Sequence, residues 1–170
     1  MITVLRLSHR IERDKRLTTH VALISRALGA DRILFTGQYD KSLINSISKI
    51  TEKFGGPFQI EYIKDYRKFL KNNKNSEIIH LTVYGLPLNK VINKIRKSKK
   101  DKVIIIGSEK VPPEIYHIAN YNVSITNQPH SEAGALSIFL HELFKGKYKE
   151  FKNYKIKIIS KEKGKKIIKS

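Results

Sequence analysis

Residues 125–136, ITNQPHSEAGAL, form the organising centre of this chain. It follows an apolar run typical of a strand, and it leads into a segment whose apolar residues recur at helical spacing. Ser131 is a good helix N-cap, and Glu132 places a negative charge at the positive end of the helix dipole. In open α/β sheets, ligands bind where strands end and helices start. A well-capped turn that binds nothing is the alternative, and this stretch alone is compatible with both.

Strand-like and helix-like segments alternate along most of the chain. The predicted strands are residues 2–7, 32–36, 58–63, 77–83, 102–106 and 121–125. The predicted helices run from Thr18-Thr19 to Gly29, over 42–54 and 66–70, from 88 to about 97, from 112 to 119 and from 131 to 143. Such alternation indicates an α/β, three-layer domain with a mainly parallel sheet. We expect this domain to span residues 1–148, and residues 149–170 to form a basic, Lys-rich C-terminal extension with short β-like pieces.

The charge of the chain is strongly unbalanced. Lys and Arg number 34 against 15 Asp and Glu, which gives a formal net charge of +19. Ion pairs need both signs, so pairing alone does not account for the excess, although a genome that favours Lys, Ile and Asn would. A polyanionic partner explains the charge more directly, and nucleic acid is favoured over a membrane because no basic helix with a bulky apolar face stands out.

Several classes of protein are disfavoured by what the sequence does not contain. It has no Cys, which excludes a disulfide scaffold and suits a cytoplasmic protein. No apolar run is long enough to span a membrane, and we expect no signal segment. The six His residues show no close ligand pair such as H-E-x-x-H, so we expect no metal site.

Three loops are predicted to meet at the carboxyl edge of the sheet. They are residues 81–85, 107–111 and 126–132, each of which lies at the end of a predicted strand. Backbone groups in such loops could hold a small flat ligand, whereas the G-x-G-x-x-G and P-loop motifs are absent. His130-Ser131-Glu132 invites a serine hydrolase interpretation. That interpretation is the least favoured, because neighbours at a helix start do not point at one another and the G-x-S-x-G elbow is missing.

A second candidate site is the basic segment from His9 to Arg16, which we expect to be a loop after the first strand. Its arginines suit phosphate recognition. The alternative is a solvated turn in which Glu12 and Asp14 pair with neighbouring cations. The net charge of the chain favours the anion site.

The chain resembles a known family of enzymes. The stretches VIIIGSE (103–109) and NQPHSE (127–132) are similar to the second and third motifs of the SPOUT methyltransferases. The stretches LRLSHR (5–10), RDKR (13–16), TTHVAL (18–23) and LTVYG (81–85) narrow the resemblance to the archaeal tRNA cytidine-56 2′-O-methyltransferases. The likeness covers nearly the whole chain up to about Phe144.

The resemblance implies an S-adenosylmethionine-dependent homodimer that methylates the 2′-hydroxyl of cytidine-56 in the T-loop of tRNA. It also implies a SPOUT-type fold with a C-terminal trefoil knot. A tRNA-binding protein of the same fold without catalysis is the alternative, and binding of the methyl donor distinguishes the two.

The resemblance further implies roles for particular residues. The residues expected around the methyl donor are Leu81, Gly107, Ser108, Glu109, Lys110, Val111, Ile125, Thr126, Asn127, Gln128, Pro129, His130, Ser131 and Glu132. Related enzymes carry an Arg in the first motif that accepts the hydroxyl proton, but here Leu23 lies near that position. We therefore favour Arg16 over Arg10 and Arg26, acting within one chain or across the dimer. Glu109 and Ser131 are the other candidate catalytic residues.

Five basic residues are expected to contact tRNA phosphates, together with the Lys-rich extension. They are Arg10, Arg13, Lys94, Arg96 and Lys97.

Overall fold

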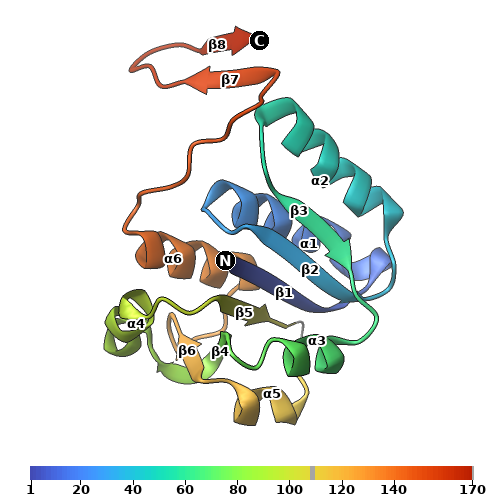
Figure 1. Ribbon diagram of the computed structural model, residues 1–170, viewed down its shortest axis with the longest axis vertical. Coiled ribbons are helices and arrows are strands. Elements are labelled where there is room, and N and C mark those ends of the chain that lie inside the picture. The colour runs from blue at the N-terminus through green and yellow to red at the C-terminus, as the bar shows by residue number, and fades with distance from the viewer. Residues whose placement is uncertain (108–109, 170) are drawn as a thin grey trace.

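The computed structural model describes residues 1–107 and 110–169 of the chain. A parallel sheet with strand order β3-β2-β1-β5-β4-β6 forms its centre (Figure 1). The strands are β1 (Ile2–His9), β2 (Arg32–Gly37), β3 (Gln59–Tyr62), β4 (Glu77–Pro87), β5 (Lys102–Ile106) and β6 (Tyr121–Ser124). The chain builds outward from β1 to one edge and then returns, inserting β5 between β1 and β4. The carboxyl ends of β4, β5 and β6 therefore lie side by side.

Helices cover both faces of this sheet, as the alternation predicts. Their bounds are α1 (Ile11–Ala27), α2 (Lys41–Phe54), α3 (Tyr66–Asn72), α4 (Leu88–Lys97), α5 (Pro113–Ile118) and α6 (Glu132–Phe144). Buried residues of α1, α2, α4 and α6 pack in one apolar cluster, whereas those of α3 and α5 pack in another on the opposite face. The prediction of a three-layer α/β domain with a mainly parallel sheet is confirmed.

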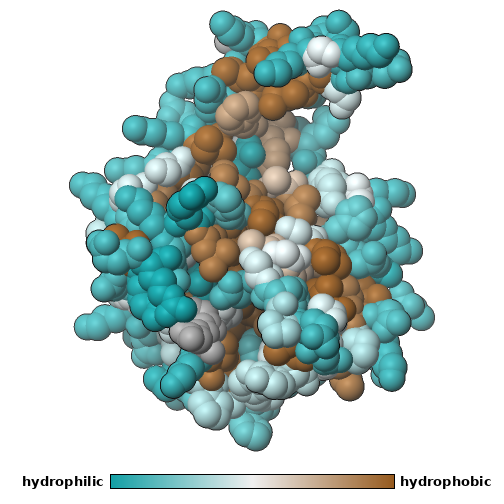
Figure 2. All heavy atoms as spheres, turned by 180° about the vertical axis from the view of Figure 1, so that it is seen from behind, coloured by the Kyte–Doolittle hydropathy of each residue, from teal (hydrophilic) through white to brown (hydrophobic). Residues whose placement is uncertain are grey.

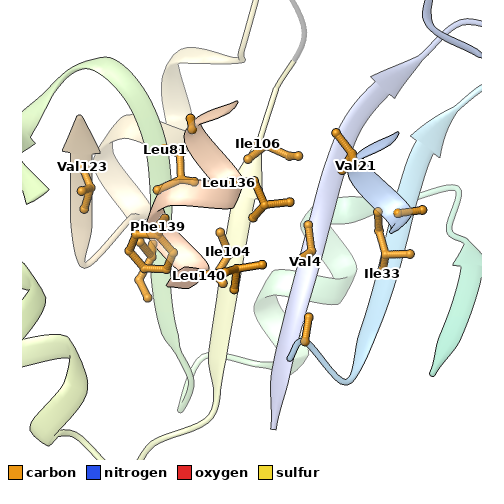
Figure 3. Close-up of a cluster of buried hydrophobic side chains, with 14 of the residues drawn as sticks. Val4, Val21, Ile33, Leu81, Ile104, Ile106, Val123, Leu136, Phe139 and Leu140 are labelled. Carbon is orange, nitrogen blue, oxygen red and sulfur yellow. The ribbon is translucent and has the colours of Figure 1, made fainter. Parts of the chain in front are cut away.

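The core depends on strands that are buried on both faces. Figure 3 shows Leu136, Phe139 and Leu140 of α6 beside Ile104 of β5. The next residue of that strand, Ile105, belongs to the cluster on the opposite face. Successive side chains of a strand point to opposite faces, so a continuous apolar run is what such a strand requires. Each fully buried Leu or Phe side chain stabilises the fold by about 2 kcal/mol.

The start of α1 differs from the prediction, since most of the expected basic loop is helical. Arg10 donates from its backbone N and its Nε to Oδ2 of Asp14, one helical turn away. Thr18 is buried inside the helix, and Thr19 donates back to the carbonyl of Lys15, so neither residue caps the helix. The i,i+4 pair and the acidic residues of the first turn favour the earlier start.

Strand β4 also runs further than predicted, to Pro87. It pairs with β6 twice, because both Leu81 and Leu86 lie opposite Val123. The segment between them arches over the end of β6, and Gly85 makes this possible. A Cβ at Gly85 would lie 2.4 Å from the backbone N of Val123, closer than any side chain allows.

The C-terminal residues form an antiparallel hairpin of β7 (Ile156–Ile159) and β8 (Lys166–Lys169). The segment before it is held to the body by a bridge between Gly56 and Lys152 and by the guanidinium of Arg26, which lies 4.0 Å from the centre of the Phe151 ring. Figure 2, seen from behind, shows the hairpin projecting beyond the body with apolar atoms among hydrophilic ones.

Candidate functional site

A cavity of about 510 Å³ lies at the carboxyl edge of β4, β5 and β6. Eight residues expected at a ligand site line it: Leu81, Gly107, Val111, Ile125, Pro129, His130, Ser131 and Glu132. They come from all three predicted loops, which are far apart in the sequence. The structure therefore brings together residues of the three loops, as their positions at the strand ends predicted. The roles of these residues in ligand binding stay predictions.

The other residues expected around the ligand lie elsewhere. Lys110, Thr126, Asn127 and Gln128 are exposed and do not line the cavity, although the Asn127 side chain donates to the carbonyl of Val83 and ties the last loop to β4. The two expected residues Ser108 and Glu109 lie outside the described part of the chain.

Gly107 is buried where β5 enters its loop, and the space beside it is filled. A Cβ built on Gly107 would lie 1.9 Å from Cγ2 of Val111, another residue of the cavity wall. Any side chain here displaces Val111 and changes the shape of the cavity. The close approach of backbone and wall is the reason for glycine at this position.

The start of α6 supplies the polar end of the cavity. Ser131 caps the helix by accepting a hydrogen bond from the backbone N of Ala133, as predicted. His130 Nδ1 lies 2.7 Å from the carbonyl of Gln128. Among the described residues, no hydrogen bond joins Ser131 to a histidine, so the geometry of a serine hydrolase is not formed.

Glu132 has a partner that sequence reasoning missed. Its Oε1 lies 3.8 Å from Nη2 of Arg6, a β1 residue with a fully buried side chain. Burial lowers the pKa of Arg6, while the Glu132 carboxylate opposes that shift. Nε and Nη2 of Arg6 have no hydrogen-bond partner among the described residues. The charged residue in the apolar run Leu5-Arg6-Leu7 was the available signal.

Two further residues of the wall were also missed, His80 and Tyr116. His80 is fully buried in β4, and its ring meets the Tyr116 ring edge-on at a centroid distance of 4.7 Å. Nδ1 of His80 lies 2.9 Å from Oδ1 of Asn122 on β6. The signal in the sequence was a histidine inside an otherwise apolar strand, just before the LTVYG stretch.

The arginines weighed for catalysis lie outside this wall. Arg16 is exposed on α1 and does not line the cavity. Arg10 pairs with Asp14, at 3.1 Å. Arg26 points away from the cavity, where its Nη2 donates to the carbonyl of Gly55. Burial lowers the pKa of Arg26.

Of the residues expected to contact tRNA, Lys94 and Lys97 are exposed on α4, and Arg13 is exposed on α1. Arg96 is half-buried instead, and its guanidinium contacts the carbonyl and the carboxylate of Glu142 at the end of α6. It therefore joins two helices of the same chain.

Two general features of the described residues bear on function. They contain no group of three or more His, Cys, Asp or Glu side chains placed to hold a metal ion. None of the helices in this part of the chain is both long and apolar enough to cross a membrane.

Two relatives align with almost the whole length of this chain. The tRNA (cytidine(56)-2′-O)-methyltransferase of Methanocaldococcus jannaschii is 48% identical over 173 residues, which cover 99% of this chain and 96% of that protein. The protein of the same name from Thermococcus kodakarensis is also 48% identical and matches over 99% of this chain and 97% of its own length.

Solved structures show the same fold at low identity. The SpoU methyltransferase AviRb from Streptomyces viridochromogenes, in complex with AdoMet, has a TM-score of 0.60 at 12% identity. The match covers 86% of this chain, which spans only 57% of AviRb. The A. aeolicus TrmH/SpoU tRNA modifying enzyme has a TM-score of 0.61 at 18% identity, over 85% of this chain and 74% of that one.

The family itself is shown by sequence. A family model described as "tRNA ribose 2′-O-methyltransferase, aTrm56" matches residues 54–168. With that match and two relatives alike over nearly their full length, this chain belongs to the tRNA ribose 2′-O-methyltransferase family.

Proposed function

We propose that this protein transfers a methyl group from S-adenosylmethionine to the ribose 2′-hydroxyl of cytidine-56 in tRNA. The observation that carries the proposal is the cavity that three strand-end loops build in a chain of this family. Its volume of about 510 Å³ falls within the usual range for small-molecule sites, roughly 300–1,000 Å³.

The residues of the wall fit such a methyl donor. Leu81, Val111, Val123 and Ile125 offer apolar surface to a flat adenine ring. Glu132 is the one carboxylate among the described lining residues, and it suits the cationic end of the donor. When bound, S-adenosylmethionine supplies the electrophilic methyl group. The protein supplies orientation, which can lower a barrier by roughly 7–11 kcal/mol in favourable cases.

The hydroxyl proton needs an acceptor, and Arg16 remains our candidate for orienting or accepting it. Arg16 is exposed and lies off the cavity wall of its own chain. In a homodimer in which Arg16 of each subunit lies at the cavity of the other, Arg16 acts in catalysis although it does not line the cavity of its own chain. Ser131, on the wall, and Glu109, outside the described residues, are the further candidates.

The proposal includes the architecture that the family implies. The chain is proposed to be a cytoplasmic homodimer, with a SPOUT domain over residues 1–148 and a basic extension over residues 149–170. A trefoil knot is proposed in its C-terminal half, as the family resemblance implies.

The tRNA is proposed to bind through exposed cations outside the cavity. Lys94, Lys97 and Arg13 are the first candidates, together with the lysines of the extension. Arg10 and Arg96 are already paired with Asp14 and Glu142, so each guanidinium would have to contact a phosphate and its carboxylate partner together. Affinity should fall steeply with salt.

Methylation of a defined transcript tests the proposal. The protein is incubated with labelled S-adenosylmethionine and a tRNA transcript, and the modified nucleotide is mapped. The matched control is the same tRNA with 2′-deoxycytidine at position 56, which lacks the acceptor hydroxyl. Label at cytidine-56 of the first tRNA alone supports the proposal. Donor binding without transfer would instead identify a tRNA-binding protein that has lost catalysis.

A subunit-mixing experiment tests the role of Arg16. Arg16→Ala should lower turnover and leave donor binding intact, whereas Gly107→Val should abolish donor binding. After subunit exchange, half the dimers carry one site with both intact halves, so activity should recover to roughly a quarter of the unsubstituted level. A mixture that stays inactive after confirmed exchange would mean that Arg16 acts within its own chain or not at all.

A further inference from the structure

His80 occupies an unusual position in the wall of the cavity. It lies on β4 opposite Ile105 of β5, before the strand ends, so it is at the sheet side of the cavity rather than at the rim. Its side chain has 0% exposure. At the rim, by contrast, Tyr84 is 82% exposed.

The hydrogen bonds around His80 fix where its proton sits. The Asn122 side chain donates from Nδ2 to the carbonyl of Tyr116 at 2.8 Å, which orients the amide. Its Oδ1 therefore faces Nδ1 of His80 and can only accept a hydrogen bond there. Nδ1 must carry the hydrogen. In the neutral ring, Nε2 is then a bare acceptor.

The ring is held in that neutral form. Burial lowers the pKa of His80, and Asn122 is a neutral partner that only partly offsets the effect. Nε2 has no hydrogen-bond partner among the described residues. A buried acceptor without a partner is uncommon in folded proteins and calls for an explanation such as a bound ligand.

We propose that Nε2 of His80 accepts a hydrogen bond from an N–H or O–H of the adenosyl group of the methyl donor. The inference rests on the proposed function. A neutral acceptor among apolar neighbours selects a neutral donor group, and the adenosyl group offers the adenine amino group and the ribose hydroxyls. The cationic end of the methyl donor is suited to Glu132 instead. His80 is thus a specificity-determining residue of the donor site.

Donor binding without tRNA tests this assignment by calorimetry with S-adenosylmethionine. His80→Leu should weaken binding about tenfold, the upper range for one lost hydrogen bond. His80→Gln, whose amide oxygen can reach the place of Nε2, should recover most of the affinity. His117→Leu makes the same change at an exposed position of α5 that does not line the cavity, and it should bind normally.

Analogues of the donor identify the group that His80 contacts. One analogue carries hydrogen in place of the adenine amino group, and another lacks the ribose 2′-hydroxyl. The unsubstituted protein should bind the analogue that lacks the contacted group more weakly than it binds S-adenosylmethionine. His80→Leu should bind this analogue and S-adenosylmethionine equally well. If His80 had only a structural role, His80→Leu would still bind the analogue more weakly than S-adenosylmethionine.

If His80→Leu does not fold, nitrogen NMR of the unsubstituted protein decides. The Nε2 resonance of His80 should shift on donor binding as it accepts a hydrogen bond, and an unchanged resonance at saturation overturns the inference. Unchanged affinity in a folded His80→Leu overturns it equally and leaves the proposed function standing. Failure of the unsubstituted protein to bind any donor would remove both.

Discussion

Two histidines of this protein are fully buried, and they lie in opposite halves of the sheet. His9 ends β1, next to the β2–β3 half, and His80 lies on β4, in the half that builds the cavity. Burial lowers the pKa of both. Each ring also meets an aromatic ring edge-on, Phe35 for His9 and Tyr116 for His80. By burial and by the direction of the pKa shift alone, the two residues are alike.

Their ring nitrogens distinguish them. Nδ1 of His9 lies 2.9 Å from Thr18 on α1, and its Nε2 lies 3.4 Å from Asp40 at the start of α2. The second contact falls short of hydrogen-bond geometry but still sets a carboxylate against the ring. His9 thus connects three elements of the scaffold. His80 has one ring nitrogen engaged, whereas the other has no hydrogen-bond partner among the described residues. An unengaged polar atom beside a cavity, rather than burial, marks the functional residue.

The largest expected effect belongs to the scaffold side of this comparison. His9→Leu leaves the Asp40 carboxylate and the Thr18 hydroxyl without their ring partner. We expect it to lower the free energy of unfolding by about 3 kcal/mol. Urea unfolding measures the change. His80→Leu, measured in parallel, should lose less, about 1–2 kcal/mol, because it leaves a neutral amide oxygen of Asn122 without its ring partner rather than a buried carboxylate. Equal losses of stability in the two variants would mean that His80 contributes to the scaffold as much as His9 does.

Arg6 allows scaffold and site to be contrasted within a single strand, since it lies three residues before His9. Arg6→Met removes a buried cation whose Nε and Nη2 make no hydrogen bond among the described residues, and it leaves a partly exposed Glu132 carboxylate, so stability should stay within about 1 kcal/mol or increase. The Glu132 carboxylate loses its partner, and kcat/KM for methylation should fall about tenfold to a hundredfold if the cavity wall shifts. A variant that loses stability and keeps its activity would show that Arg6 belongs with His9, to the scaffold.

Much of this fold could be predicted because its signals are local. Apolar runs such as residues 102–106 and the cap at Ser131 depend on neighbouring residues, and the structure confirms both. The prediction for the start of α1 was wrong. An ion pair between Arg10 and Asp14 stabilises a helical turn there, although the composition of the segment resembles that of a loop. Local patterns therefore fail mainly where charged side chains interact one turn apart.

The chemistry of the site depends on distant pairs instead. His80 and Asn122 are 42 residues apart, and nothing in either neighbourhood indicates that one sets the tautomer of the other. Arg6 and Glu132 meet only because the fold brings β1 and the start of α6 within reach of each other. The loops could be grouped from strand order, but the polar groups that complete the wall required the tertiary structure.

A smaller effect is expected from Asn122→Leu, which removes the acceptor that fixes the His80 tautomer. If the two neutral tautomers become equally populated, only half the molecules present a bare Nε2, and donor affinity falls about twofold. Nitrogen NMR should then show both tautomers at His80 and a single, unchanged one at His9. Retention of one Nδ1-protonated form in the variant would mean that another group sets the tautomer.

The smallest effect is a pH dependence of stability that divides unequally between the two histidines. Both pKa values are lowered by burial, so the folded state resists protonation. The stabilising contribution is complete above the ordinary histidine pKa of about 6.5 and is lost as the pH falls through the lower folded-state value. The free energy of unfolding should therefore decline between about pH 7 and pH 5. Asp40 partly favours the charged form of His9, whereas Asn122, the hydrogen-bond partner of His80, is neutral. His80→Gln should remove more of this decline than His9→Gln, and His117→Gln should leave it intact. A larger change from His9→Gln would contradict the expectation that Asp40 partly offsets the effect of burial on the pKa of His9.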